Sequence, residues 1–116
     1  MGVFQSPLYN NETIIIPIDY PTIQQGINHA QNGDTIYIQS GEYSENIIVN
    51  KSVQINGENK NSVNIKGLNP SDHVFFINAN HVHISNVSIS NCSKGFSGIR
   101  IQGDHCEIKE NIIVSC

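Results

Sequence analysis

The chain has 116 residues, of which 38% are hydrophobic and 14% are charged, and its formal net charge is −4. This length and hydrophobic content suit one domain with a modest core. The single Arg and five scattered Lys form no basic run, which argues against a nucleic-acid or anionic-lipid partner, and no stretch reaches the roughly 18 apolar residues of a membrane span.

The first 33 residues are expected to precede the repeated part of the chain. Residues 1–18 form an N-terminal extension with one short strand at Thr13 to Ile16, and residues 19–33 form a capping helix. Thr22 and Gln25 have the spacing of a capping box. Apolar residues recur behind them at helical spacing: Ile23, Ile27 and Ala30. The sequence therefore predicts one short amphipathic helix.

From Asp34 onward the hydrophobic period changes to two, in short pieces separated by Asn, Gly, Ser and Asp. The predicted strands are Thr35 to Ile38, Ile47 to Val49, Val53 to Ile55, Val63 to Ile65, Val74 to Ile77, Val82 to Ile84, Val87 to Ile89, Ile99 to Ile101, Cys106 to Ile108 and Ile112 to Val114. Such strands suit either a sandwich or a solenoid, and an internal repeat decides between them.

The sequence does repeat itself. Residues 74–92, moved by 24 positions, superpose on residues 98–116 without a gap and place Ile77 on Ile101 and Ile84 on Ile108. A looser copy begins at Ile47, and each copy holds three strands. A unit of three short strands cannot close its own core, but stacked coils bury a continuous one. Residues 34–116 therefore predict an all-β parallel β-helix of roughly three coils.

The repeat fixes which side chains point inward. The expected columns are Ile47, Val49, Phe75, Ile77, Ile99 and Ile101 on the first face; Val53, Ile55, Val82, Ile84, Cys106 and Ile108 on the second; and Val63, Ile65, Val87, Ile89, Asn111 and Ile113 on the third. Asn111 is the polar exception, at a bend where Asn can bond its own backbone. The helix caps the first coil, whereas no cap follows the last, so we read the chain as truncated at its C-terminus.

Several segments in this order carry a family resemblance: Asp19-Tyr20-Pro21-Thr22-Ile23-Gln24, Gly33-Asp34-Thr35-Ile36-Tyr37-Ile38, Gly41-Glu42-Tyr43-Ser44-Glu45-Asn46-Ile47 and Lys51-Ser52-Val53-Gln54-Ile55-Asn56-Gly57. From about residue 19 to its end the chain resembles the pectin-lyase-like superfamily, which implies a right-handed β-helix. It is most similar to archaeal and bacterial surface β-helix proteins and NosD-type copper-accessory repeats, and its opening also resembles pectin methylesterases.

The resemblance implies polysaccharide lyases, hydrolases, epimerases and esterases as well as noncatalytic binding modules, so it guides fold better than function. It also implies a structural role for Glu45, which is expected to accept hydrogen bonds from turn amides. The two Asp and the Arg of the esterases have no counterpart in this sequence. The acids are dispersed over different turns, so we predict no catalytic residues in this segment: Asp34, Asp72, Asp104, Glu107 and Glu110.

The outward positions of the first face offer a candidate glycan-binding surface. Ile48, Phe76 and Arg100 fall in adjacent coils, and an exposed aromatic ring beside an Arg suits sugar stacking and hydrogen bonding. The alternative is that the loop from Leu68 to His73 covers Phe76. We keep both interpretations at this point.

The histidines form a second, weaker candidate site. His81 and His105 occupy equivalent turns with His83 nearby, and imidazoles suit copper or zinc. Equivalent turn residues also stack simply because the backbone repeats, and no third or fourth ligand has metal-like spacing. His83 and Glu107 are expected to form a surface pair. Cys92 and Cys116 are expected to stack, either as a disulfide or as a reduced pair.

We therefore expect a noncatalytic β-helix segment of a secreted or cell-surface protein, with a structural or carbohydrate-binding role. The expected partner is a polysaccharide or glycan, without nucleic acid or a cofactor, and the uncapped last coil leaves end-to-end self-association open. One alternative is the N-terminal part of a polysaccharide-active lyase, esterase, hydrolase or epimerase whose catalytic residues lie beyond residue 116. The other is a NosD-like copper-handling module.

Overall fold

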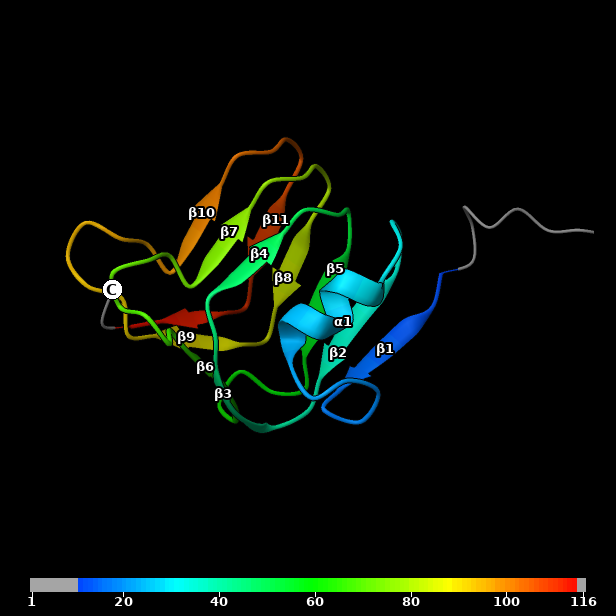
Figure 1. The fold of residues 1–116 in the computed structure, drawn as a ribbon, viewed down its shortest axis with the longest axis horizontal. Helices are drawn as coiled ribbons and strands as arrows, with labels where there is room; N and C mark the ends of the chain where they lie inside the picture. The colour runs from blue at the N-terminus through cyan, green and yellow to red at the C-terminus, as the bar shows by residue number, and fades with distance from the viewer. Residues whose placement is uncertain (1–10, 115–116) are drawn as a thin grey trace, which may run out of the picture.

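The computed structural model describes residues 11–114, which form a parallel β-solenoid of about four turns with one short helix (Figure 1). In chain order the elements are β1 (Thr13–Ile16), α1 (Ile23–His29), β2 (Thr35–Ile38), β3 (Gly41–Ser44), β4 (Ile47–Val49), β5 (Gln54–Gly57), β6 (Val63–Lys66), β7 (Phe75–Ile77), β8 (His83–Ser85), β9 (Ser88–Ser90), β10 (Ile99–Ile101), β11 (Glu107–Lys109) and β12 (Ile112–Ile113). All strand pairs are parallel, in three sheets with the orders β1-β2-β5-β8-β11, β10-β7-β4 and β12-β9-β6-β3.

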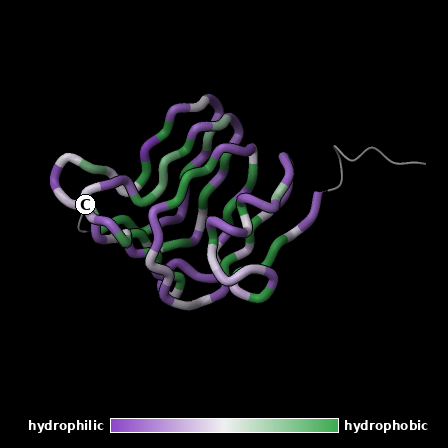
Figure 2. The backbone as a smooth tube through the Cα atoms, in the orientation of Figure 1, coloured by the Kyte–Doolittle hydropathy of each residue, from purple (hydrophilic) through white to green (hydrophobic). Residues whose placement is uncertain are grey.

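The stacking predicted from the repeat is confirmed. Ile101 pairs with Ile77 between β10 and β7, and Ile108 pairs with Ile84 between β11 and β8. Buried residues alternate with more exposed residues along β4, β5 and β6, and in β5 and β6 the more exposed residues are polar (Figure 2). The buried core is largely aliphatic, and Ile84 within it is fully inaccessible to solvent. Burial of these columns is the main source of stability.

The solenoid contains one more turn than expected. Strands β2, β3 and β4 form a first turn, and β3 was not predicted because its sequence, Gly41 to Ser44, has no aliphatic alternation. Only Tyr43 of this strand is buried, and its pairing with Ile65 of β6 places it in the core. The expectation of roughly three coils was therefore too low.

The N-terminal elements close one end of the core. The predicted strand at Thr13–Ile16 is confirmed as β1, and it pairs with β2 before the chain enters α1. The N-cap half of the predicted capping box is confirmed, since the Thr22 side chain accepts a hydrogen bond from the Gln25 amide. Gln25 Oε1 accepts from the Thr22 hydroxyl. A Cβ atom at Gly26 would lie 2.8 Å from Ile16 Cδ1, so this glycine allows the helix to approach β1 closely. Among the described residues, no helix has the length and apolar character to cross a membrane.

The corners between strands repeat with the strands. His81 and His105 both have a positive φ, of 59° and 58°, and Asn86 and Glu110 repeat the same pattern at 61° and 57°. Asn111 follows the last of these corners. Its side chain accepts a hydrogen bond from Val87 N and donates one to Ile84 O. Asn111 therefore bonds the backbone of the preceding turn, whereas the sequence had led us to expect a bond to its own backbone.

Candidate functional site: the outer face of the β4–β7–β10 sheet

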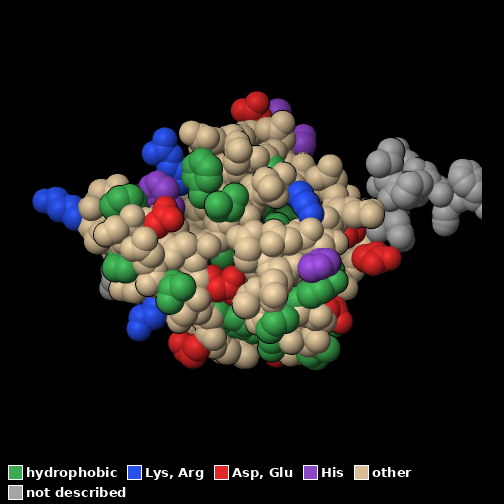
Figure 3. All heavy atoms as spheres, viewed as in Figure 1, with side chains coloured by type: hydrophobic (Ala, Val, Ile, Leu, Met, Phe, Trp, Pro, Cys, Tyr) green, Lys and Arg blue, Asp and Glu red, His purple; other side chains and the backbone are tan. Residues whose placement is uncertain are grey.

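Three outward side chains line up across the sheet formed by β4, β7 and β10. Phe76 is paired in register with Ile48 on one side and Arg100 on the other. Ile48 is 54% exposed, Arg100 is exposed and Phe76 is half-buried. Figure 3 shows hydrophobic side chains beside a cationic one over these strands. The structure therefore brings the three predicted site residues together as a ladder along the solenoid axis.

Two further rings extend this ladder. His73 lies at the end of the loop before β7, and its ring stacks on Phe76 with centroids 6.4 Å apart and an interplanar angle of 21°. Phe96, from the loop before β10, meets His73 edge to face at 5.5 Å. These geometries are ordinary for aromatic pairs. The loop from Leu68 to His73 thus contacts Phe76 through one ring, and Phe76 retains partial exposure.

The loop that carries His73 is held in place by Asn46. Its Nδ2 donates to Asn69 O at 3.1 Å and to His73 O at 2.9 Å, and its Oδ1 accepts from Asn69 N at 2.7 Å. The His73 ring is fixed in turn, because its Nδ1 accepts a hydrogen bond from Ser97 N at 2.9 Å. A neutral ring in this arrangement carries its proton on Nε2. The position of His73 is therefore set by hydrogen bonds at both its backbone and its ring.

A small hollow of about 120 Å³ lies between this loop and the sheet. It is lined by Asn46, Ile47, Ile48, Asp72, His73 and Phe76. A carboxylate, an imidazole and an apolar floor meet here, and Arg100 lies beside Phe76 on the next turn. Such a surface can stack an apolar ring face while accepting and donating hydrogen bonds at its rim.

Sequence reasoning identified the ladder but missed His73, Asp72, Asn46 and Phe96. Their common signal is that they lie in the loops that precede β4, β7 and β10. His73 and Phe96 are the aromatic residues of the two successive loops that precede β7 and β10. The loops differ in their remaining residues, so the repeat alone did not place these rings against Phe76.

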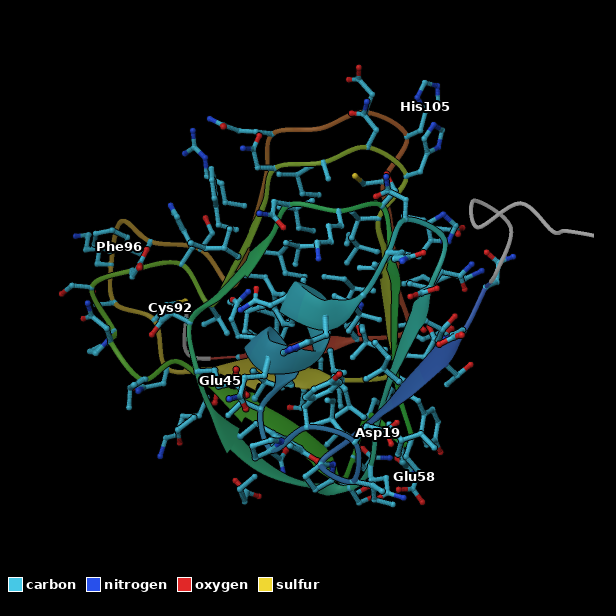
Figure 4. The ribbon with its side chains drawn as sticks, turned by 45° about the vertical axis from the view of Figure 1, so that its right-hand side comes forward. Asp19, Glu45, Glu58, Cys92, Phe96 and His105 are labelled. Atoms are coloured by element: carbon cyan, nitrogen blue, oxygen red, sulfur yellow. The ribbon has the colours of Figure 1, made fainter. Side chains whose placement is uncertain are left out.

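The three candidate histidines do not lie together in one site. The rings of His81 and His105 stack with centroids 5.1 Å apart, whereas His83 Nδ1 lies 3.4 Å from Glu107 Oε1, as expected for that surface pair. In Figure 4 His105 lies at the opposite side of the turn from Phe96, so the histidine stack is separate from the candidate face. Within residues 11–114, no three His, Cys, Asp or Glu side chains form a group that could hold a metal ion.

Several acids have structural partners. Asp34 is buried, and its two oxygens accept hydrogen bonds from Glu12 N and Gln31 N. Lys60 Nζ lies 3.0 Å from Glu110 Oε1, and this hydrogen bond and charge hold the Glu110 pKa below its ordinary value. Both carboxylates therefore have partners within the fold.

Glu45 accepts hydrogen bonds from backbone amides, as the resemblance implied. The amides belong to the first turn of α1: Ile23 N donates to Oε2 at 2.8 Å and Gln24 N to Oε1 at 3.0 Å (Figure 4). The carboxylate thereby satisfies two donors that have no partner within the helix.

The pairing expected for Cys92 and Cys116 lies outside the described residues, because Cys116 is not among them. Comparison of the chain with family models, with curated proteins and with solved structures gave no match.

Proposed function

We propose that this solenoid is a right-handed, pectin-lyase-like β-helix and that the chain is a noncatalytic segment of a secreted or cell-surface protein, which binds polysaccharide on its β4–β7–β10 face. The observation that supports the proposal is the in-register ladder of Ile48, Phe76 and Arg100, with His73 packed against it. Its residues come from three successive turns, so the ladder runs along the axis on which the turns stack.

The chemistry of the face matches that of a sugar chain. A pyranose ring has an apolar C–H face that stacks on an aromatic side chain, and its hydroxyl groups both donate and accept hydrogen bonds. Phe76 supplies the platform, Arg100 supplies donors, and the carboxylate of Asp72 in the adjoining hollow supplies acceptors. Neighbouring strands lie about 4.8 Å apart, so successive turns present contacts at short, regular intervals to an extended polymer.

A noncatalytic role is supported by the positions of the acids. Asp72 is the one carboxylate that lines the hollow, and hydrolysis or acid-base elimination requires at least one further titratable group converging on the same bond. His73 is the other titratable group there, but its Nδ1 is already engaged by Ser97 N. The face is accordingly suited to holding a ligand.

A glycan-array screen followed by titration calorimetry tests this function. We expect the screen to identify a polysaccharide, and Phe76→Ala and Arg100→Ala each to weaken its binding about tenfold, the loss of roughly one good contact. Tyr37→Ala and Lys66→Ala are matched controls, because these outward residues lie on the other two sheets and should leave affinity unchanged. Absence of any glycan ligand, or unchanged binding in both test variants, would rule out the proposed face.

A further inference from the structure

The hollow beside Phe76 is too small to enclose a sugar ring. Its volume is about 120 Å³, whereas pockets that enclose a whole small-molecule ligand measure roughly 300–1,000 Å³. A water molecule takes about 30 Å³ of liquid volume, so the hollow has room for a group of a few non-hydrogen atoms. Phe76 belongs both to the ladder and to the lining of the hollow. A ring that stacks on Phe76 therefore has the hollow beside it for one substituent.

Most donors around the hollow are already bonded within the fold. Asn46 commits both N–H groups and the oxygen of its side chain to the backbone of the loop that carries His73. On the sheet side, Ile47 N donates to a backbone carbonyl at 2.7 Å, and Ile48 N donates to the side chain of Gln24 at 2.7 Å. These groups therefore offer no further donor to a ligand.

Two lining side chains keep a polar group for a ligand. The Oδ1 atom of Asp72 accepts a hydrogen bond from His73 N at 2.8 Å, which leaves Oδ2 as an acceptor. The Nδ1 atom of His73 accepts from Ser97 N, which leaves Nε2–H as the donor of the neutral ring. The remaining lining includes the apolar side chains of Ile48 and Phe76. The hollow thus presents one acceptor, one donor and an apolar surface.

We propose that the hollow binds the acetamido group of an N-acetylated sugar, so that the polysaccharide recognised by the β4–β7–β10 face contains N-acetylhexosamine units. This inference rests on the proposed glycan binding and names its substrate class. The N–H of the acetamido group donates to Asp72 Oδ2, and its carbonyl oxygen accepts from His73 Nε2–H. Its methyl group packs on Ile48, while the sugar ring stacks on Phe76.

Other substituents at the same carbon use the hollow less well. A hydroxyl group forms hydrogen bonds but leaves the apolar surface uncovered. An ammonium group is attracted to Asp72, but it has only donors to set against the His73 N–H. A carboxylate is repelled by the charge of Asp72. The secondary amide combines a donor, an acceptor and a methyl group, so the hollow discriminates by what the other substituents leave unpaired or uncovered.

A glycan array of matched oligosaccharides that differ only at C2 of the sugar tests the inference. Each matched set carries an acetamido, an amino or a hydroxyl group at C2, in the gluco, galacto and manno series. Titration calorimetry then measures the dissociation constants of a bound oligosaccharide and its two matched partners. We expect the acetamido member of at least one series to bind about tenfold more tightly than the other two, the gain of about one good contact.

Three variants separate the hollow from the rest of the face. Asp72→Asn replaces one of the two acceptor oxygens by a donor, whichever way the new amide is turned, and should reduce the tenfold preference to nearly none. Arg100 lies outside the residues that line the hollow, so Arg100→Ala should weaken all three ligands alike and leave the preference unchanged. Asp104→Asn makes the same change of charge at an exposed corner and should alter neither affinity nor preference.

The outcomes distinguish this inference from the proposed function. Binding that depends on Arg100 but shows no preference for the acetamido group, or prefers the amino or hydroxyl group, would overturn the inference and leave the glycan-binding face. A preference that survives in Asp72→Asn would also overturn it, because the acetamido group would then be recognised elsewhere. Absence of any glycan ligand, or binding that is unchanged in both Arg100→Ala and Phe76→Ala, would overturn the proposed function and this inference with it.

Discussion

Gln24 and Ile48 are joined by two hydrogen bonds that reproduce the pairing of neighbouring strands. Ile48 N donates to Gln24 Oε1 at 2.7 Å, and Gln24 Nε2 donates to Ile48 O at 3.0 Å. A side chain of the capping helix thus occupies the place of a strand at the edge of β4. This contact links the first turn of the solenoid to its cap.

Replacing Gln24 by Ala is expected to lower the free energy of unfolding by about 1–3 kcal/mol, because two backbone groups lose their partners. The amide of Ile48 should exchange faster with solvent in this variant, measured by hydrogen exchange. Gln54→Ala is the control, because Gln54 is an exposed residue inside a sheet. Equal exchange at Ile48 in the wild type and Gln24→Ala would show that Gln24 does not protect the edge.

The core columns make a second prediction. Ile84 is fully buried and lies between Ile55 and Ile108 in its column, so Ile84→Ala should destabilise the fold by about 2–5 kcal/mol. Ile48→Ala removes the same atoms from an outward position and should change stability by less than about 0.5 kcal/mol. Urea unfolding measures both. If Ile84→Ala does not fold, Ile84→Val should still cost about 0.5–1.5 kcal/mol, and equal losses at the two positions would contradict the inward assignment.

The pair of Lys60 and Glu110 predicts a change in titration. The hydrogen bond and charge of Lys60 lower the Glu110 pKa, so Lys60→Ala should return it toward 4.5, as followed by NMR of the carboxyl carbon. Because the folded pKa is depressed, the pair stabilises the fold above the ordinary pKa, and this contribution is lost as pH falls through the folded value. Lys66→Ala is the control, and an unchanged Glu110 pKa in Lys60→Ala would show that the pair is not formed.

The ionisation of Tyr43 predicts how the stability of the fold changes at alkaline pH. Burial, followed by the charges of Glu45 and Glu58, raises its pKa above 10.0. A raised pKa means that folding favours the neutral phenol, so this contribution is present below the ordinary pKa and lost as pH rises through the folded one.

At neutral pH, Tyr43→Phe should lower stability by about 0.5–1.5 kcal/mol, because the hydroxyl donates to Gln39 O at 2.7 Å. Above pH 10.0 the difference from the wild type should shrink, because the variant lacks the ionisation. Urea unfolding from neutral to alkaline pH measures this difference in stability, with Tyr37→Phe as the outward-facing control. A difference that stays constant with pH would contradict the account.

The repeat explains why much of the fold was predictable. Residues 74–92 and 98–116 have the same spacing, so the pairing of Ile84 with Ile108 could be inferred from position alone. The first turn lacks this regularity. Thr35 pairs with Gln54, Gly41 with Val63 and Ile47 with Phe75, so each strand of that turn has a different offset from its partner.

The candidate site was predictable in part for a related reason. Ile48, Phe76 and Arg100 lie on strands, where alternation determines which side chains point outward. His73 and Phe96 lie on loops, where position depends on contacts such as that between Asn46 and the His73 carbonyl, which local pattern does not encode. The split of His83 from the stacked His81 and His105 likewise follows from backbone geometry, because His83 is on a strand and the other two are at left-handed corners.

The central claim is that equivalent residues of successive turns lie one above the other, and NOE spectroscopy of isoleucine methyl groups tests it most directly. The structure predicts cross-peaks between Ile77 and Ile101 and between Ile84 and Ile108, whose strands pair in register. Absence of these cross-peaks, with antiparallel Hα–Hα contacts between consecutive strands in their place, would contradict the solenoid and the ladder of side chains on its face.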